Sequence, residues 1–162
     1  MARRVFFSFH YERDIWRAGQ IRNCWVGRDR EQSGFWDAAS WESIKRQGEE
    51  AVRRWINQQL NGTSVTAVLI GAETASRPYV RYEIQRSYEV GNGLLGIYIH
   101  NIRDQHQRTD VQGVNPFSQI FVEQGGQRLS LAQTIPTYDW VNDRGYQNCG
   151  SWIEAAATKA GR

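Results

Sequence analysis

The chain has few cysteines, and this limits the kinds of site it can form. Its 162 residues include two, Cys24 and Cys149, which cannot make a disulfide framework, and no CxxC pair suggests zinc. The three histidines, His10, His100 and His106, each adjoin a different predicted element and lack the spacing of metal ligands. We therefore expect no metal site.

Long apolar runs are also missing. No segment approaches the length of a membrane span. The basic residues near the N-terminus, Arg3 and Arg4, lead into a short mixed strand and not into a long apolar signal segment. These features predict a soluble, cytoplasmic protein with no membrane partner.

The sequence has no dense run of one charge. Twenty Lys and Arg residues face 17 Asp and Glu residues, and the resulting net charge of +3 is mixed along the chain. A nucleic-acid-binding protein usually has a denser basic patch, so we expect no nucleic-acid partner, whereas a small anionic ligand needs only a few arginines. Because neither a repeat nor a change of composition divides residues 1–162, they are expected to form a single domain.

Strand-like and helix-like segments alternate along the chain, which predicts an α/β protein with a parallel sheet. The strands are expected at residues 3–9, 35–37, 65–71, 94–99 and 135–138. The helices are expected from Asp14 (with Ile15, Ala18, Ile21 and Trp25 on one side), from Ser40 to Leu60, from about 76 to 90, and around 152–157. A hairpin is expected at residues 119–131.

The helix that follows the strand at 65–71 has clear signals at its start. Ser76 is a candidate cap, and Pro78 fits the first turn, where its missing N–H costs nothing. Val80, Ile84 and Tyr88 recur at helical spacing and predict one buried face.

A second stripe on this helix carries the most interesting carboxylate. Tyr79, Glu83 and Ser87 lie about 100° around the helix from the buried face. A residue in the first turns of such a helix lies near the carboxyl edge of the sheet, where open α/β sheets bind ligands. Glu83 is therefore a candidate catalytic residue, and the alternative is a surface carboxylate paired with Arg86 or Arg77.

Aromatic residues gather at the same predicted edge. With seven Trp, seven Tyr and six Phe, the chain has enough rings to fill a core and to line a pocket. Aromatic walls beside one carboxylate suit a flat, cationic ring attached to a ribose. The candidates for such a wall are Phe9, Tyr11, Trp36, Trp41 and Tyr79. His10 closes the first strand at this edge, and its alternative interpretation is a solvated loop histidine.

Two motif-like features do not predict function. Residues 91–96 match GxGxxG, but a helix precedes them and a strand follows, so no helix N-terminus would meet a phosphate. Ser8 is not in a GxSxG elbow, which argues against a hydrolase-type serine nucleophile.

Several blocks of sequence, in the same order, resemble the TIR-like proteins of bacterial Thoeris anti-phage defence, the ThsB family. The resemblance extends from residue 1 to about 153. The blocks are Arg-Val-Phe-Phe-Ser-Phe-His-Tyr at 4–11, Phe-Trp-Asp-Ala and Ser-Trp-Glu within 35–42, residues 61–71, Val-Arg-Tyr-Glu-Ile at 80–84, Tyr-Asp-Trp-Val at 138–141 and Gly-Ser-Trp at 150–152.

This resemblance implies a flavodoxin-like TIR fold, with strand order 2-1-3-4-5 and helices on both faces of the sheet. It implies an enzyme that cleaves NAD+ at the nicotinamide–ribose bond and makes a cyclic ADP-ribose isomer. That product would signal to a separate effector after a phage-derived trigger, and self-association would complete the site. NAD+ would be the substrate, with no further cofactor.

The resemblance also implies roles for individual residues. The Val-Arg-Tyr-Glu context assigns catalysis to Glu83. Together with the aromatic wall, the resemblance predicts a substrate site made of Phe9, His10, Tyr11, Asp37, Trp41 and Tyr79. The sequence departs from the family in having Tyr79 where many TIR enzymes carry Trp, an abbreviated second strand and a shortened insert before the last helix.

Two other functions are compatible with such a fold. A TIR-type scaffold can act by protein–protein association without catalysis, because the fold alone does not imply an enzyme. A response-regulator-like domain fits less well, since no acidic cluster follows the first strand.

Overall fold

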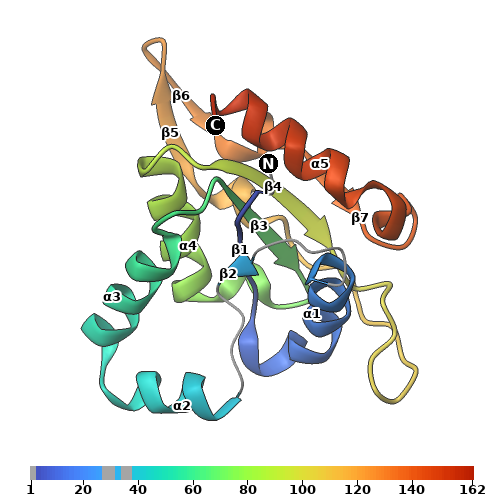
Figure 1. Ribbon diagram of the computed structural model, residues 1–162. Coiled ribbons are helices and arrows are strands. Elements are labelled where there is room, and N and C mark those ends of the chain that lie inside the picture. The colour runs from blue at the N-terminus through green and yellow to red at the C-terminus, as the bar shows by residue number, and fades with distance from the viewer. Residues whose placement is uncertain (1–2, 27–31, 34–37) are drawn as a thin grey trace.

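A five-stranded parallel sheet forms the centre of the protein. The computed structural model describes residues 3–26, 32–33 and 38–162 (Figure 1). The strands lie in the order β2 (Gln32–Ser33), β1 (Val5–Ser8), β3 (Val65–Ile70), β4 (Gly93–Tyr98) and β7 (Thr137–Asp139). Each neighbouring pair is parallel. Counted along the chain, the sheet strands have the order 2-1-3-4-5, which confirms the predicted flavodoxin-like topology.

Helices cover both faces of this sheet (Figure 1). Helices α1 (Tyr11–Val26) and α5 (Gly145–Lys159) pack on one face, and α3 (Glu49–Leu60) and α4 (Pro78–Glu89) pack on the other. Strand β1 alternates between the two: Phe7 joins the cluster under α1 and α5, whereas Phe6 packs against α3. The next residue on the side of Phe6 is Ser8, which therefore points toward the α3 and α4 layer.

A small hairpin projects from the body of the fold (Figure 1). Strands β5 (Phe121–Gln124) and β6 (Gln127–Ser130) pair antiparallel. Gly125 and Gly126 make the turn with φ values of 59° and 79°, which suit glycine. The hairpin predicted at residues 119–131 is thus confirmed. Short 3₁₀ turns, η2 (Pro116–Gln119) and η3 (Leu131–Gln133), flank it, and a third, η1 (Thr74–Ser76), precedes α4.

The glycine-rich segment 91–96 has a structural role, as its surroundings predicted. It links α4 to β4 and meets no helix N-terminus. A Cβ atom on Gly93 would lie 2.4 Å from the backbone oxygen of Ala156, so glycine allows α5 to pack closely on β4.

The prediction of one long helix from Ser40 to Leu60 is wrong. The chain instead forms α2 (Ala38–Arg46) and α3, separated at Gly48. Gly48 has a φ of 101°, a conformation that a glycine adopts readily and that ends the regular helix. Apolar residues keep their helical spacing across Gly48, so hydrophobic periodicity did not reveal the break between the two helices.

Two smaller predictions, about a helix cap and a helix face, are also wrong. Ser76 belongs to η1 and donates to the backbone oxygen of Glu73 over 2.8 Å, so it does not cap α4, whose N-cap is Arg77. Tyr88 was expected on the buried face of α4, but it is 36% exposed. It lies at the margin of the apolar stripe, where periodicity does not resolve burial.

Several boundaries differ from the predicted ones. Helix α1 begins at Tyr11 and not at Asp14, and α5 spans Gly145–Lys159, more than the predicted 152–157. The second strand predicted at residues 35–37 lies outside the described residues, and β2 occupies Gln32–Ser33.

Among the described helices, none combines the length and apolar character needed to cross a membrane.

Candidate active site

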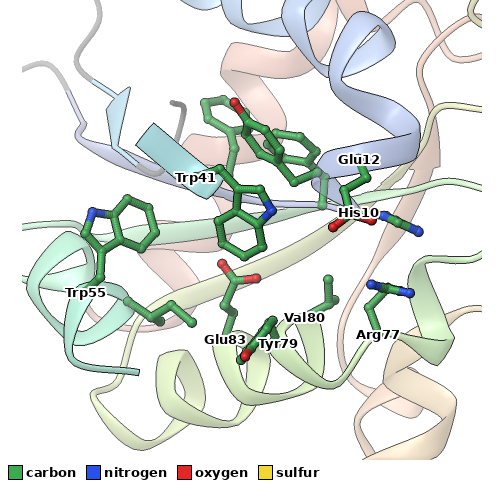
Figure 2. A pocket seen from close by; sticks show the side chains of 12 residues that line it. His10, Glu12, Trp41, Trp55, Arg77, Tyr79, Val80 and Glu83 are labelled. Carbon is green, nitrogen blue, oxygen red and sulfur yellow. The ribbon is translucent and has the colours of Figure 1, made fainter. Parts of the chain in front are cut away.

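A pocket opens at the carboxyl edge of the sheet, beside the end of β1 (Figure 2). Its volume is about 530 Å³, including space at the mouth that is open to solvent. The end of β1, the turn into α1, and helices α2, α3 and α4 all contribute to it. The lining residues are Phe7, Phe9, His10, Tyr11, Glu12, Trp41, Trp55, Ile56, Arg77, Tyr79, Val80 and Glu83.

Glu83 lies in the second turn of α4 and points into this pocket (Figure 2). Its side chain is buried, with 8% of the residue exposed. Ser8 Oγ donates a hydrogen bond to Glu83 Oε1 over 3.1 Å. Among the described residues Glu83 forms no ion pair, and Arg86 instead pairs with Glu89 at 3.0 Å. The alternative interpretation of Glu83 as a paired surface carboxylate is therefore wrong.

The surroundings of Glu83 disfavour its charged form. Burial raises the pKa of Glu83 from 4.5 to about 8, and the hydrogen bond from Ser8 offsets only part of this increase. In the empty pocket the carboxyl group is mostly protonated at neutral pH. A cationic ligand beside it would favour the carboxylate, so binding of a cation and ionisation of Glu83 support each other.

Stacked rings form one wall of the pocket, as predicted. Phe9 stacks on Tyr11 with centroids 5.5 Å apart, and Tyr11 stacks on Trp41 at 5.4 Å. Trp41 meets Tyr79 edge to face at 6.0 Å. In Figure 2 the Glu83 carboxyl group points toward the Trp41 ring. The structure thus brings together residues that lie on three helices and a strand end.

The mouth of the pocket is polar. His10, Glu12 and Arg77 lie there together (Figure 2), and Glu12 forms an ion pair with Lys45 of α2. His10 is buried, which excludes its interpretation as a solvated loop histidine. Burial lowers the pKa of His10, and the positive charge of Arg77 lowers it further, although Glu12 acts in the opposite direction. At neutral pH His10 is therefore uncharged, and Arg77 supplies positive charge at the mouth.

Two of the predicted residues cannot be compared with the structure. Asp37, predicted to bind substrate, and Trp36, predicted for the aromatic wall, lie outside the described residues. The other predicted residues, Phe9, His10, Tyr11, Trp41, Tyr79 and Glu83, all line the same pocket.

The sequence did not predict a role for Arg77, Trp55 and Glu12, which line this pocket, or for Ser8, which contacts Glu83 from behind the lining. Ser8 was considered only as a nucleophile, although the alternation of β1 could have directed it toward Glu83. Arg77 directly precedes Pro78 and so had to lie at the same edge. Trp55 falls in the apolar stripe of the helix predicted from Ser40 to Leu60, which favours a place in the core, and nothing in the sequence distinguishes Glu12 from a surface carboxylate. No cluster of three His, Cys, Asp or Glu side chains suited to a metal occurs among the described residues.

The fold and pocket define a flavodoxin-like α/β domain with a pocket at the carboxyl edge of its sheet. Residues 6–104 match the family described as Thoeris protein ThsB, TIR-like domain. The chain is similar to a protein of Bacillus cereus (strain MSX-D12) named "Putative cyclic ADP-D-ribose synthase ThsB1". The two are 35% identical over an alignment of 191 positions, gaps included, which spans 94% of this chain and all of that protein. The chain belongs to the ThsB family of TIR-like proteins.

Proposed function

We propose that this protein is a TIR-type enzyme that cleaves NAD+ at the nicotinamide–ribose bond and closes the remaining part into a cyclic ADP-ribose isomer. The observation that carries the proposal is a buried carboxyl group, Glu83, inside a pocket walled by aromatic rings. The name of the Bacillus cereus relative, which describes a cyclic ADP-D-ribose synthase, supports the same reaction.

The shape and charge of the pocket suit the two ends of such a substrate. The rings of Trp41, Tyr11 and Tyr79 offer flat surfaces for the cationic nicotinamide, which stacks favourably on aromatic faces. Arg77 at the mouth offers a guanidinium group for the diphosphate, and neutral His10 beside it offers a further hydrogen bond.

Glu83 acts on the charge that develops during cleavage. As the bond from C1′ to nicotinamide breaks, its electron pair leaves with the neutral nicotinamide, and positive charge grows on the ribose. The Glu83 carboxylate accepts hydrogen bonds from the ribose hydroxyls and stabilises this oxocarbenium-like centre. Removing such a group typically costs several kcal/mol of transition-state stabilisation.

A closed aromatic site favours cyclisation over hydrolysis. When water is excluded, the adenosine part of the same molecule is the available nucleophile. A lone pair of the adenosine part forms the new bond to C1′, and the products are nicotinamide, the cyclic isomer and a proton. The buried position of Glu83 and the stacked wall beside it support such exclusion.

The wider role follows from the family. We propose that the protein works in the cytoplasm as a single domain in anti-phage defence, and that its product activates a separate effector protein. A phage-derived trigger starts the reaction, and self-association completes the site. The substrate NAD+ is the only small molecule that the reaction needs, and neither nucleic acid nor a membrane takes part.

The test is nicotinamide release from NAD+ by purified protein, with and without extract from phage-infected cells. Glu83→Gln should release nicotinamide at least about 100-fold more slowly than the wild type. Glu89→Gln, an exposed carboxylate on the same helix, is the matched control and should keep the wild-type rate. An unchanged rate in Glu83→Gln contradicts the assignment, and no turnover by the wild type at any protein concentration favours a scaffold without catalysis.

A further inference from the structure

A second hollow lies at the opposite edge of the sheet, where β1, β3 and β4 begin. Four arginines line it: Arg3 before β1, Arg54 on α3, Arg86 on α4, and Arg162. We call it the arginine hollow. Its volume is about 1270 Å³, including space open to solvent. No residue of the Glu83 pocket contributes to it.

The arginine hollow carries more positive charge than its neighbours balance. None of its described lining residues is acidic. Arg3 pairs with Glu154 at 2.8 Å and Arg86 pairs with Glu89 at 3.0 Å. Arg54 forms no ion pair among the described residues, so its guanidinium group is available for an anion.

Helix ends in this region would normally repel an anion, because their last carbonyl groups carry partial negative charge. Here guanidinium groups donate to backbone carbonyls just beyond the ends of two of these helices. Arg162 donates to the backbone oxygen of Gly91 over 3.1 Å, just beyond the end of α4. Arg4 donates to the backbone oxygen of Asn61, just beyond α3, over 3.4 Å. These positive groups offset part of the negative potential at the two helix ends.

A neutral hydrogen-bond donor adds to the charges. The hydroxyl of Tyr82 donates to Asn57 Oδ1 over 2.9 Å and so fixes the orientation of this amide. The amide nitrogen of Asn57, which lines the hollow, remains as a donor. Asn57 lies one turn along α3 from Arg54, on the same side of the helix.

We propose that the arginine hollow is a second binding site, separate from the Glu83 pocket, for a small phosphate-bearing ligand of the nucleotide class. Guanidinium groups bind phosphate through paired hydrogen bonds, and a concave patch lined by four of them fits a phosphate group better than an extended nucleic acid backbone, which needs a basic stripe.

Titration calorimetry on the full-length protein tests this, with inorganic pyrophosphate and ADP as probes. Binding of both probes should weaken at least about tenfold in the double variant Arg54→Ala/Arg86→Ala and should fall with added salt. Arg53 is a neighbouring exposed arginine that pairs with Glu49, and the control variant Arg53→Ala should bind both probes like the wild type. Tighter binding of ADP than of pyrophosphate supports a nucleotide ligand, and equal or weaker binding of ADP overturns the nucleotide part of the proposal.

The arginine hollow and the Glu83 pocket are distinguished by a second set of variants. Trp41→Ala and Glu83→Gln should keep the affinity for both probes, whatever their effect on NAD+ cleavage. The proposal is wrong if neither probe binds at millimolar concentration, if binding survives the double arginine variant, or if it is lost in Trp41→Ala. If the double variant does not fold, the single variant Arg54→Gln at this exposed position replaces it.

Discussion

Ser8 and Glu83 are joined by a hydrogen bond, from the last residue of β1 to the second turn of α4. The donor is Ser8 Oγ and the acceptor is Glu83 Oε1, 3.1 Å apart. Ser8 is fully buried, and among the described residues it is the only hydrogen-bond partner of this carboxyl group. Oε2 remains available to a ligand.

Replacing Ser8 with alanine should shift the pH dependence of catalysis. Without the donor, the pKa of Glu83 rises further above its ordinary value, so the carboxylate forms only at higher pH. We expect the pH profile of nicotinamide release to move to more alkaline pH and the rate at pH 7 to fall about tenfold. Ser87→Ala, another buried serine that does not touch the carboxyl group, should leave the midpoint unchanged. If the midpoint of the pH profile of nicotinamide release is the same in Ser8→Ala as in the wild type, the prediction is wrong.

Glu83 should also make stability depend on pH. Because the pKa of Glu83 is raised to about 8 in the folded protein, the folded state keeps a proton that the unfolded chain releases above its ordinary pKa of 4.5. The free energy of unfolding should therefore fall as pH rises from 5 toward 8, by up to about 3 kcal/mol at pH 7. Glu83→Gln removes this contribution.

Urea denaturation of the wild type and Glu83→Gln at pH 5, 6, 7 and 8 measures this effect. The variant should gain stability relative to the wild type as pH increases, because all other titrating groups are shared. A difference in the free energy of unfolding that does not change with pH would show that Glu83 ionises normally in the folded protein.

Trp41 should matter for substrate binding. Its ring stacks on Tyr11 and meets Tyr79, so Trp41→Ala removes the middle of the aromatic wall. We expect KM for NAD+ to rise about tenfold, with Trp41→Phe closer to the wild type. Trp16 is 52% exposed on α1, and Trp16→Ala serves as the control that removes a tryptophan away from the pocket. Equal KM values in the Trp41→Ala and Trp16→Ala proteins would contradict this role.

Two glycines should respond to alanine in opposite directions. A Cβ atom on Gly19 in α1 meets nothing within 4 Å, so Gly19→Ala should raise the free energy of unfolding by about 0.5–1 kcal/mol through helix propensity. A Cβ atom on Gly93 would lie 2.4 Å from a backbone oxygen of α5. Gly93→Ala should therefore lower the free energy of unfolding by about 2 kcal/mol or more. Thermal unfolding of both variants checks the pair, and a destabilised Gly19→Ala would show that α1 is more tightly packed than the structure indicates.

Local patterns in the sequence were sufficient for the class of fold. The apolar runs at β3 and β4 predicted buried parallel strands, and both strands are buried almost throughout. The carboxyl-edge rule then placed Glu83, Phe9 and Tyr79 together from the sequence alone. The resemblance to ThsB proteins supplied the identity of the substrate, which no local pattern contained.

Other features depend on contacts between distant segments. The break at Gly48 separates α2 from α3, but apolar residues keep their helical spacing on both sides of it. This spacing shows only which side of a helix is buried, so it did not reveal where one helix ends. The arginine hollow likewise joins residues from position 3 to position 162, whose charges look evenly mixed along the chain.

By itself the sequence determined the alternating elements, the parallel sheet and the edge at which Glu83 lies, because these follow from hydrophobic periodicity and from local turn chemistry. Only the tertiary structure decided the state of Glu83. Its burial beneath the aromatic wall and its hydrogen bond to Ser8, 75 residues earlier in the chain, together set its pKa. Desolvation depends on every neighbour that surrounds a group in space, and no local pattern of residues records it.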